Sequence, residues 1–96
     1  MKYATLLLTQ REIARLIDMR TAIRVTRQAF EAMARGETVM PPKVYLPIPR
    51  QGDFRAMPAF LKRPSACGVK WVNVHPHNRA RGLPTEIGRA SCRERV

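Results

Sequence analysis

The character of this sequence changes from helical to extended between Gly36 and Pro42, and that change limits what the chain can fold into. Upstream of it, apolar residues recur at the three- and four-residue spacing of a helix. Gly36 stands where a helix C-terminal cap is expected, and Pro41-Pro42 cannot continue a helix because proline lacks an N–H. Downstream, short apolar segments are separated by turn residues. We therefore predict an α+β fold in which N-terminal helices pack on a mixed sheet.

The N-terminal part is predicted to form a short strand followed by two helices. Residues 3–8 make an apolar run that suits a strand. The next four residues, from Thr9 to Glu12, fit a capping box, in which the two side chains satisfy each other's backbone N–H groups. The first helix is predicted to end near Asp18, and the second to cover about residues 20–35.

The C-terminal part is predicted to form three strands. Residues 43–48 alternate in character, and their prolines favour an edge position. Residues 51–53 carry a turn signal, so residues 54–61 are predicted to return as the second strand of a hairpin. Residues 67–74 give the strongest strand pattern, and residues 75–84 are predicted to form a polar loop.

Composition restricts the classes of protein that the chain can belong to. Its 96 residues support one small domain at most. The net charge of +11 raises the possibility of a nucleic-acid-binding module, which stays as an alternative. The basic residues are dispersed, however, and aromatic residues at 6% offer few stacking platforms. No apolar run is long enough to span a membrane, no signal peptide is evident, and two cysteines make no disulfide framework, so we expect a cytoplasmic location.

Residues 86–96 differ from the rest of the chain. They are basic and aperiodic, and they resemble, residue for residue, one reading frame of a common short-read sequencing adapter. We therefore expect the natural sequence to end at Thr85, so that residues 1–85 are the natural part and residues 86–96 are a non-native tail. Such a tail should make few contacts, and its removal should leave the folding stability unchanged.

Three cations lie on or beside the predicted strands: Lys43, Arg55 and Lys70. A charge in a central strand is costly unless it is paired or used. Three convergent cations would suit a small carboxylate, because arginine can hold one through two parallel hydrogen bonds and lysine acts as a point charge. The alternative is that Lys43 and Arg55 face solvent on an alternating hairpin, while Lys70 extends its ammonium to solvent.

Lys70 is the strongest candidate for a catalytic residue. Its neighbours Val69, Trp71 and Val72 are apolar, so we expect a mostly buried strand. No carboxylate in the local sequence can pair with its ammonium, and an arriving substrate carboxylate would supply the missing charge.

Two other kinds of site have little support. His75-Pro76-His77 places two histidines in a loop without a nearby Cys or Asp, so no metal site is predicted. The chain contains no dinucleotide fingerprint or phosphate loop. We therefore expect this chain by itself to bind no cofactor and to be inactive.

The order and spacing of four motifs identify a resemblance that covers about residues 3–85. These motifs are MPPKV from residue 40, DFRAMPA from residue 53, GVKWVN from residue 68, and HPHN through GLPT over residues 75–85. Together they resemble the N-terminal third of the ornithine cyclodeaminase/mu-crystallin family. The resemblance implies a two-domain enzyme, in which a substrate and dimerisation domain accompanies a Rossmann domain that binds NAD or NADP.

The resemblance also implies roles for four residues. Lys43 and Arg55 are similar to residues that bind the substrate carboxylate. Lys70 is similar to a catalytic lysine that contacts the same carboxylate and assists proton transfer, and Thr85 to a threonine near the cofactor. The family's later arginine and its catalytic aspartate lie beyond Thr85. A full-length parent would be a homodimer acting on a small amino acid or 2-oxo acid.

Arg55 favours one branch of the family over another. Ornithine cyclodeaminases carry an acid at this position, which can meet the side-chain ammonium of ornithine, whereas alanine dehydrogenases of the archaeal type carry arginine. A cation there repels a diamino acid and attracts a carboxylate such as that of pyruvate. We therefore expect a 2-oxo-acid or cyclic-imine reductase. An ornithine cyclodeaminase and a mu-crystallin-like ligand-binding protein stay as alternatives.

Overall fold

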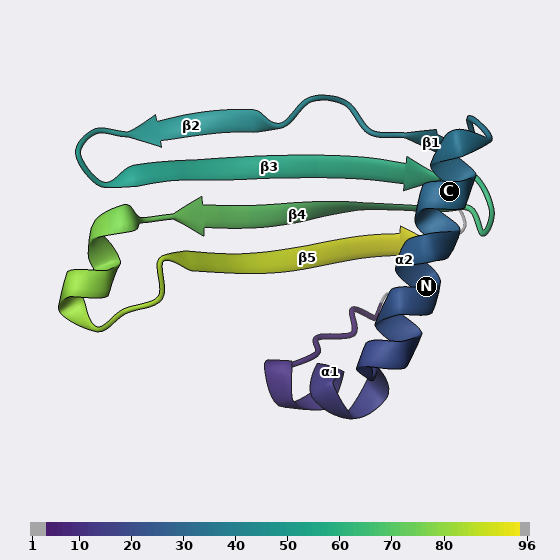
Figure 1. Cartoon of the computed structure of the whole chain (residues 1–96), viewed down its shortest axis with the longest axis horizontal. Helices are drawn as coiled ribbons and strands as arrows, with labels where there is room; N and C mark the ends of the chain where they lie inside the picture. Colours follow the sequence, from purple (N-terminus) through teal and green to yellow (C-terminus); the bar gives the residue numbers. More distant parts are fainter. Residues whose placement is uncertain (1–3, 95–96) are drawn as a thin grey trace. The chain divides into compact units, whose positions relative to one another are not determined.

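The computed structural model describes residues 4–94, which form two helices and a sheet (Figure 1). The chain divides into two compact units at Glu31 and Ala32. The first unit holds α1 (Gln10–Leu16) and most of α2 (Met19–Ala34). The second holds the end of α2 and every strand of the described chain. The predicted α+β class is confirmed.

Local hydrogen bonds explain where the helices begin. The predicted capping box is present: the Thr9 hydroxyl accepts from the Glu12 N–H at 3.2 Å, and the Glu12 carboxylate accepts from the Thr9 N–H at 2.8 Å. Asp18 begins α2 in a similar way, because its carboxylate accepts from the Thr21 N–H at 2.8 Å. This hydrogen bond lowers the pKa of Asp18.

The end of α2 follows the prediction for Gly36. This glycine has φ 73°, and the Glu37 N–H donates to the Ala32 carbonyl at 2.9 Å, which is the hydrogen-bond pattern of a Schellman cap.

The predicted strand over residues 3–8 is wrong where the structure describes it. Residues 4–8 pair with no strand of the described chain, and an apolar run without a partner does not form a ladder. Tyr3 lies outside the described residues.

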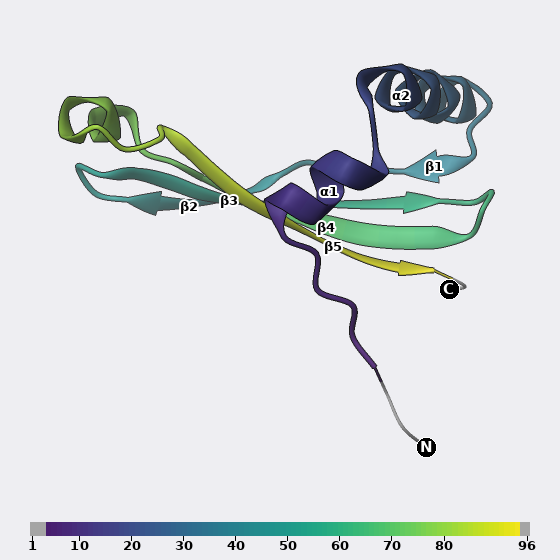
Figure 2. The ribbon, with the colours of Figure 1, turned by 90° about the horizontal axis from the view of Figure 1, so that it is seen from below.

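Five strands form one sheet, seen nearly edge-on as a single twisted layer in Figure 2. Four of them follow the order β1-β3-β4-β5, and β2 pairs with the same edge of β3 as β1 does. The bounds are β1 (Thr38–Val39), β2 (Val44–Ile48), β3 (Gly52–Leu61), β4 (Ala66–Val74) and β5 (Glu86–Glu94). The three predicted strands thus correspond to β2, β3 and β4.

The sheet is antiparallel throughout the described residues, so the prediction of a mixed sheet is wrong. The connections explain the difference. Short turns join β2 to β3 and β3 to β4, and a parallel neighbour would need a crossover of a dozen or more residues.

The predicted loop after β4 contains a 3-10 helix, η1 (Pro76–Arg81), which ends at Gly82 in the left-handed conformation.

The C-terminal segment forms β5, which pairs with β4 along its whole length. The expectation that residues 86–96 make few contacts is therefore wrong for the described part of that segment. The free edge of β4 presents backbone N–H and C=O groups, and any extended chain can pair with them whatever its side chains. Side-chain periodicity therefore does not predict that this segment forms a strand. The adapter origin of these residues stays a prediction.

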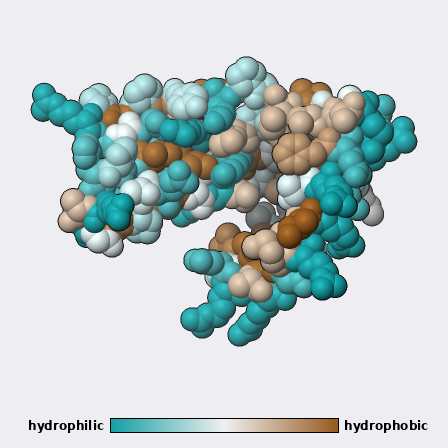
Figure 3. Space-filling model, viewed as in Figure 1, coloured by the Kyte–Doolittle hydropathy of each residue, from teal (hydrophilic) through white to brown (hydrophobic). Residues whose placement is uncertain are grey.

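Strand alternation gives the sheet two faces of different character. The cationic face carries Lys43, Tyr45, Asp53, Arg55, Met57, Lys70, Val72 and Glu86. The apolar face carries Val44, Leu46, Phe54, Phe60, Val69, Trp71 and Ile87, together with Arg89 and Arg93 of β5. The rings of Phe54 and Trp71 lie 5.5 Å apart on it. The space-filling view shows hydrophobic atoms at the surface over strands and helices (Figure 3). Among described residues only Ala32 and Val72 are buried.

None of the helices within residues 4–94 has the length and apolar character needed to span a membrane.

We predict that deleting residues 86–96 destabilises the chain. The deletion would leave β4 as an edge strand and would uncover Val72, which pairs with Gly88. The midpoint of thermal unfolding, followed by circular dichroism, should fall by about 5 °C or more. Replacing Arg89 and Arg93 by threonine should retain the midpoint, because the backbone pairing is kept. An unchanged midpoint after the deletion would show that β5 adds nothing to stability.

Candidate carboxylate-binding site

The strand register brings the three predicted cations to one face of the sheet. Arg55 on β3 pairs with Tyr45 on β2 and Val72 on β4. One step along β3, Met57 pairs with Lys70. Lys43 directly precedes β2, and its position in the register lies beside Met57. Because directly opposed residues of antiparallel strands share a face, the three cations surround Met57 on the cationic face.

Tyr45 links two of these cations. The Arg55 guanidinium carbon lies 4.9 Å from the centroid of the Tyr45 ring, and the Lys43 ammonium nitrogen lies 5.9 Å from it. Both distances suit cation–π attraction, which places positive charge against the electron-rich face of the ring. Lys43 and Arg55 therefore both lie near the Tyr45 ring.

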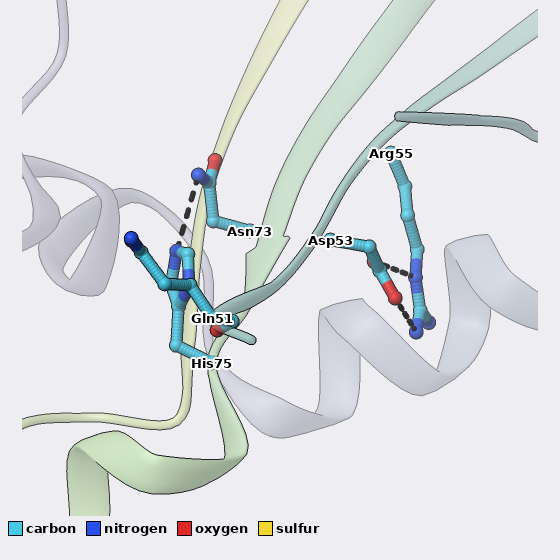
Figure 4. A network of polar contacts seen from close by, with 5 residues as sticks. All are labelled: Gln51, Asp53, Arg55, Asn73 and His75. Carbon is cyan, nitrogen blue, oxygen red and sulfur yellow. Dashed lines mark hydrogen bonds and ion pairs between the residues drawn. The ribbon is translucent and has the colours of Figure 1, made fainter. Parts of the chain in front are cut away.

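Asp53 forms an ion pair with Arg55 that the sequence analysis missed (Figure 4). The Arg55 Nε–H donates to Oδ1 at 2.6 Å, and Nη2 donates to Oδ2 at 3.1 Å. The sequence indicates only a turn and a family motif at Asp53. The signal that could have found the pair is the two-residue separation, which places both side chains on the same face of one strand.

The charges around Asp53 stabilise its ionised form. The hydrogen bond from Arg55 is the main cause of a lowered pKa of Asp53, and the positive charges of Arg55 and Lys43 add to it. The same hydrogen bond raises the pKa of Arg55. Both groups are therefore charged at neutral pH. The carboxylate offsets one of the three cations and leaves this part of the face positive.

Lys70 lies on the cationic face but is exposed to solvent. The expectation of a mostly buried strand is therefore wrong at this residue: on β4, Val72 is buried, whereas Lys70 and Trp71 are exposed. The reason is that the described sheet is a single layer, and alternation alone cannot remove a side chain from water. Lys70 makes no ion pair with any described residue. Its ammonium is accessible to an anion.

A hydrogen-bond network fixes the end of the sheet that carries Asp53 (Figure 4). His75 Nδ1 lies 2.9 Å from the Gln51 carbonyl, which can only accept, so Nδ1 carries the proton. The other ring nitrogen, Nε2, then accepts from the Asn73 amide at 3.3 Å. The backbone N–H of His75 donates to the Thr85 carbonyl at 2.7 Å. Thr85 is thereby held beside the end of β4.

No group of three or more metal-ligating side chains is found within the part of the chain that the structure describes. His75 is engaged on both ring nitrogens by Gln51 and Asn73, as Figure 4 shows.

The described residues form an α+β unit with an antiparallel sheet, and comparison with known proteins identifies the family to which it belongs. The model of the ornithine cyclodeaminase/mu-crystallin family matches residues 3–90. The chain belongs to this family. The resemblance found in the sequence is confirmed.

Individual relatives are consistent with that assignment. The chain is 51% identical over 81 residues to an alanine dehydrogenase of Archaeoglobus fulgidus, a match that covers 84% of this chain and 24% of the relative. Among solved structures, an archaeal alanine dehydrogenase dimer with bound NAD has a TM-score of 0.84 and 46% identity, covering 94% of this chain and 27% of that one.

A second solved structure, the Δ1-pyrroline-2-carboxylate reductase of Thermococcus litoralis in complex with NADH and L-proline, has a TM-score of 0.83 and 28% identity. That match covers 94% of this chain and 28% of the reductase. The chain therefore spans about a quarter of the length of the relatives that it matches.

The Asp53–Arg55 ion pair should make the folding stability depend on pH in the acidic range. The pKa of Asp53 is lower in the folded chain than its ordinary value of 3.8, so the ion pair stabilises the fold above that pH. The stabilisation is lost as the pH falls through the folded pKa. We predict that Asp53→Asn lowers the thermal midpoint at pH 7, and that the difference from the parent chain closes as the pH falls through the folded pKa of Asp53.

Direct titration of the Asp53 carboxyl carbon by NMR gives the matching control. Replacing Arg55 by methionine removes the main cause of the shift and should return the pKa of Asp53 toward its ordinary value. A difference between parent and Asp53→Asn that stays constant down to acid pH would argue against this account.

Proposed function

We propose that this chain is the N-terminal part of the substrate-binding domain of an NAD(P)-dependent oxidoreductase that acts on a small amino acid, 2-oxo acid or cyclic imine acid. The observation that carries the proposal is the placement of Lys43, Arg55 and Lys70 on one sheet face, within a chain of the ornithine cyclodeaminase/mu-crystallin family. The similar proteins include an alanine dehydrogenase and pyrroline-2-carboxylate reductases, which supports an oxidoreductase.

Each cation has a part in the proposed site. Lys43 and Arg55 bind the substrate carboxylate, since Arg55 supplies a planar set of donors and Lys43 a nearby point charge. Lys70 is diagonal to Arg55 across β3 and β4, a separation of roughly 7–8 Å between such neighbours. A carboxylate held by Arg55 thus leaves the adjacent carbonyl or imine carbon within reach of the Lys70 side chain. There Lys70 acts as the acid or base for proton transfer.

The cofactor belongs mainly to the remainder of the proposed parent. A nicotinamide cofactor, NAD or NADP, supplies or accepts a hydride when it is bound. Of the described residues, only Thr85 is proposed to approach it, at the exposed end of the sheet beside His75. The solved neighbours carry NAD or NADH, which supports this class of cofactor for the parent. The 96-residue chain alone is expected to bind none.

Arg55 favours a carboxylate or oxo-acid substrate over ornithine. Its charge is held in place by Asp53 and Tyr45, so a substrate ammonium would meet a fixed cation at this position. The identity with an alanine dehydrogenase supports pyruvate or a similar 2-oxo acid. We propose a homodimeric parent, supported by the dimeric solved neighbour and by the exposed apolar face, where Leu46 is 60% exposed. A cytoplasmic location stays a prediction.

The substrate class is tested with a clone that extends past Thr85 through the natural reading frame. We predict NAD(P)H-dependent reductive amination of pyruvate, or reduction of Δ1-pyrroline-2-carboxylate, measured by the loss of cofactor absorbance. Ammonia release from ornithine should be slow in comparison, because Arg55 repels the side-chain ammonium. Rapid cyclodeamination of ornithine would overturn the choice of substrate.

The roles of the lysines are separable by kinetics in the same extended enzyme. Lys70→Ala should lower kcat by about two orders of magnitude, the usual scale for a positioned acid or base. Lys43→Ala should raise the KM for the carboxylate substrate about tenfold while kcat changes little, because it removes binding alone. Lys62→Ala, an exposed lysine at the end of β3, serves as the matched control. A folded Lys70→Ala enzyme with near-normal turnover would show that Lys70 simply projects into solvent.

A further inference from the structure

The geometry of the Asp53–Arg55 pair leaves one edge of the guanidinium available. Arginine has five N–H donors in a planar fork. Asp53 takes the Nε–H and one N–H of Nη2, at 2.6 and 3.1 Å. The two N–H groups of Nη1 and the second N–H of Nη2 donate no hydrogen bond to Asp53. One N–H of Nη1 and the remaining N–H of Nη2 form the end-on edge of the fork, which is suited to a second carboxylate.

The surroundings of Arg55 partly shield the Asp53–Arg55 ion pair from solvent. The Arg55 side chain is 27% exposed and that of Asp53 is 25% exposed. The Tyr45 ring lies 4.9 Å from the guanidinium carbon, a distance that suits cation–π attraction. Both charged residues project from the same strand, two positions apart. Asp53 therefore restricts the rotation of Arg55 through a short contact within β3.

We propose that Asp53 is a positioning residue for the carboxylate site: it occupies the Nε/Nη2 edge of Arg55 and thereby directs the Nη1/Nη2 edge toward the substrate carboxylate. This inference rests on the proposed role of Arg55 as a carboxylate ligand. Asp53 does not touch the substrate and acts through Arg55.

Charge and orientation predict opposite effects for the loss of Asp53. If Asp53 acted only as a negative charge, its removal would strengthen the binding of an anion at Arg55. If it acts by orientation, its removal frees the guanidinium to rotate, and the anion must bear the cost of ordering it. The sign of the change in affinity therefore separates the two roles.

The test uses the 96-residue chain labelled with 15N at arginine, and acetate as the carboxylate probe. In the parent chain, acetate should shift the Nη signals of Arg55 while the Nε–H signal stays in place, because Nε remains bonded to Asp53. In Asp53→Asn, the dissociation constant for acetate should rise about fivefold, in keeping with the modest strength of a partly exposed ion pair. Glu37→Gln, which removes the other arginine ion pair, should leave acetate binding unchanged.

Three outcomes would overturn the proposal. One is equal or tighter acetate binding by Asp53→Asn, another is displacement of the Nε–H signal as acetate binds, and the third is the absence of any response of Arg55 to acetate. If Asp53→Asn fails to fold, as judged from its backbone spectrum, the Nε–H signal of the parent chain still decides. Failure of the proposed function is a separate result, seen as the absence of oxo-acid and imine reduction in the extended enzyme.

Discussion

The antiparallel register of β3 is the constraint on which the rest of the structure depends. β3 pairs with β1 and β2 on one side and with β4 on the other, so it decides which side chains share a face. A slip of one residue would move Arg55 to the apolar face. Gly52 helps to prevent such a slip: it has φ 127°, and a Cβ there would collide with the Val74 carbonyl oxygen. The glycine at the start of β3 thus favours the register that places the cations on one face.

A single-layer sheet explains both the exposure of the apolar face and that of Lys70. Trp71 is 40% exposed and Leu46 is 60% exposed, although both are large and apolar. A sheet normally buries a face against a second layer of structure. Within the described residues of the second unit, no such layer covers the apolar face. The chain spans about a quarter of the length of the relatives that it matches.

The charges of the cationic face are arranged so that Asp53 offsets Arg55 without removing its ability to donate. A carboxylate that formed hydrogen bonds to both terminal nitrogens would block the end-on edge of the fork. The contact through Nε and Nη2 keeps that edge free, and the Tyr45 ring lies 4.9 Å from the guanidinium carbon. Lys43 and Lys70 add positive charge to the same face.

Sequence alone determined the local elements and the family. The capping box at Thr9, the cap at Gly36 and the strands that became β2, β3 and β4 follow from short-range hydrogen bonding and alternation, which depend only on near neighbours. The ordered motifs were sufficient for the family because their spacing is specific. The residues of the candidate site were also chosen from the sequence, but not the contacts between them.

Tertiary structure decided whatever depends on pairing and burial. The ladder between β4 and β5, the antiparallel sense of the sheet, and the gathering of Lys43, Arg55 and Lys70 around Met57 arise from residues far apart in the chain. The exposure of Lys70 depends on what covers the sheet, which the pattern of β4 does not contain. Residues 4–8 form no strand because an apolar run becomes a strand only when another edge accepts its backbone hydrogen bonds.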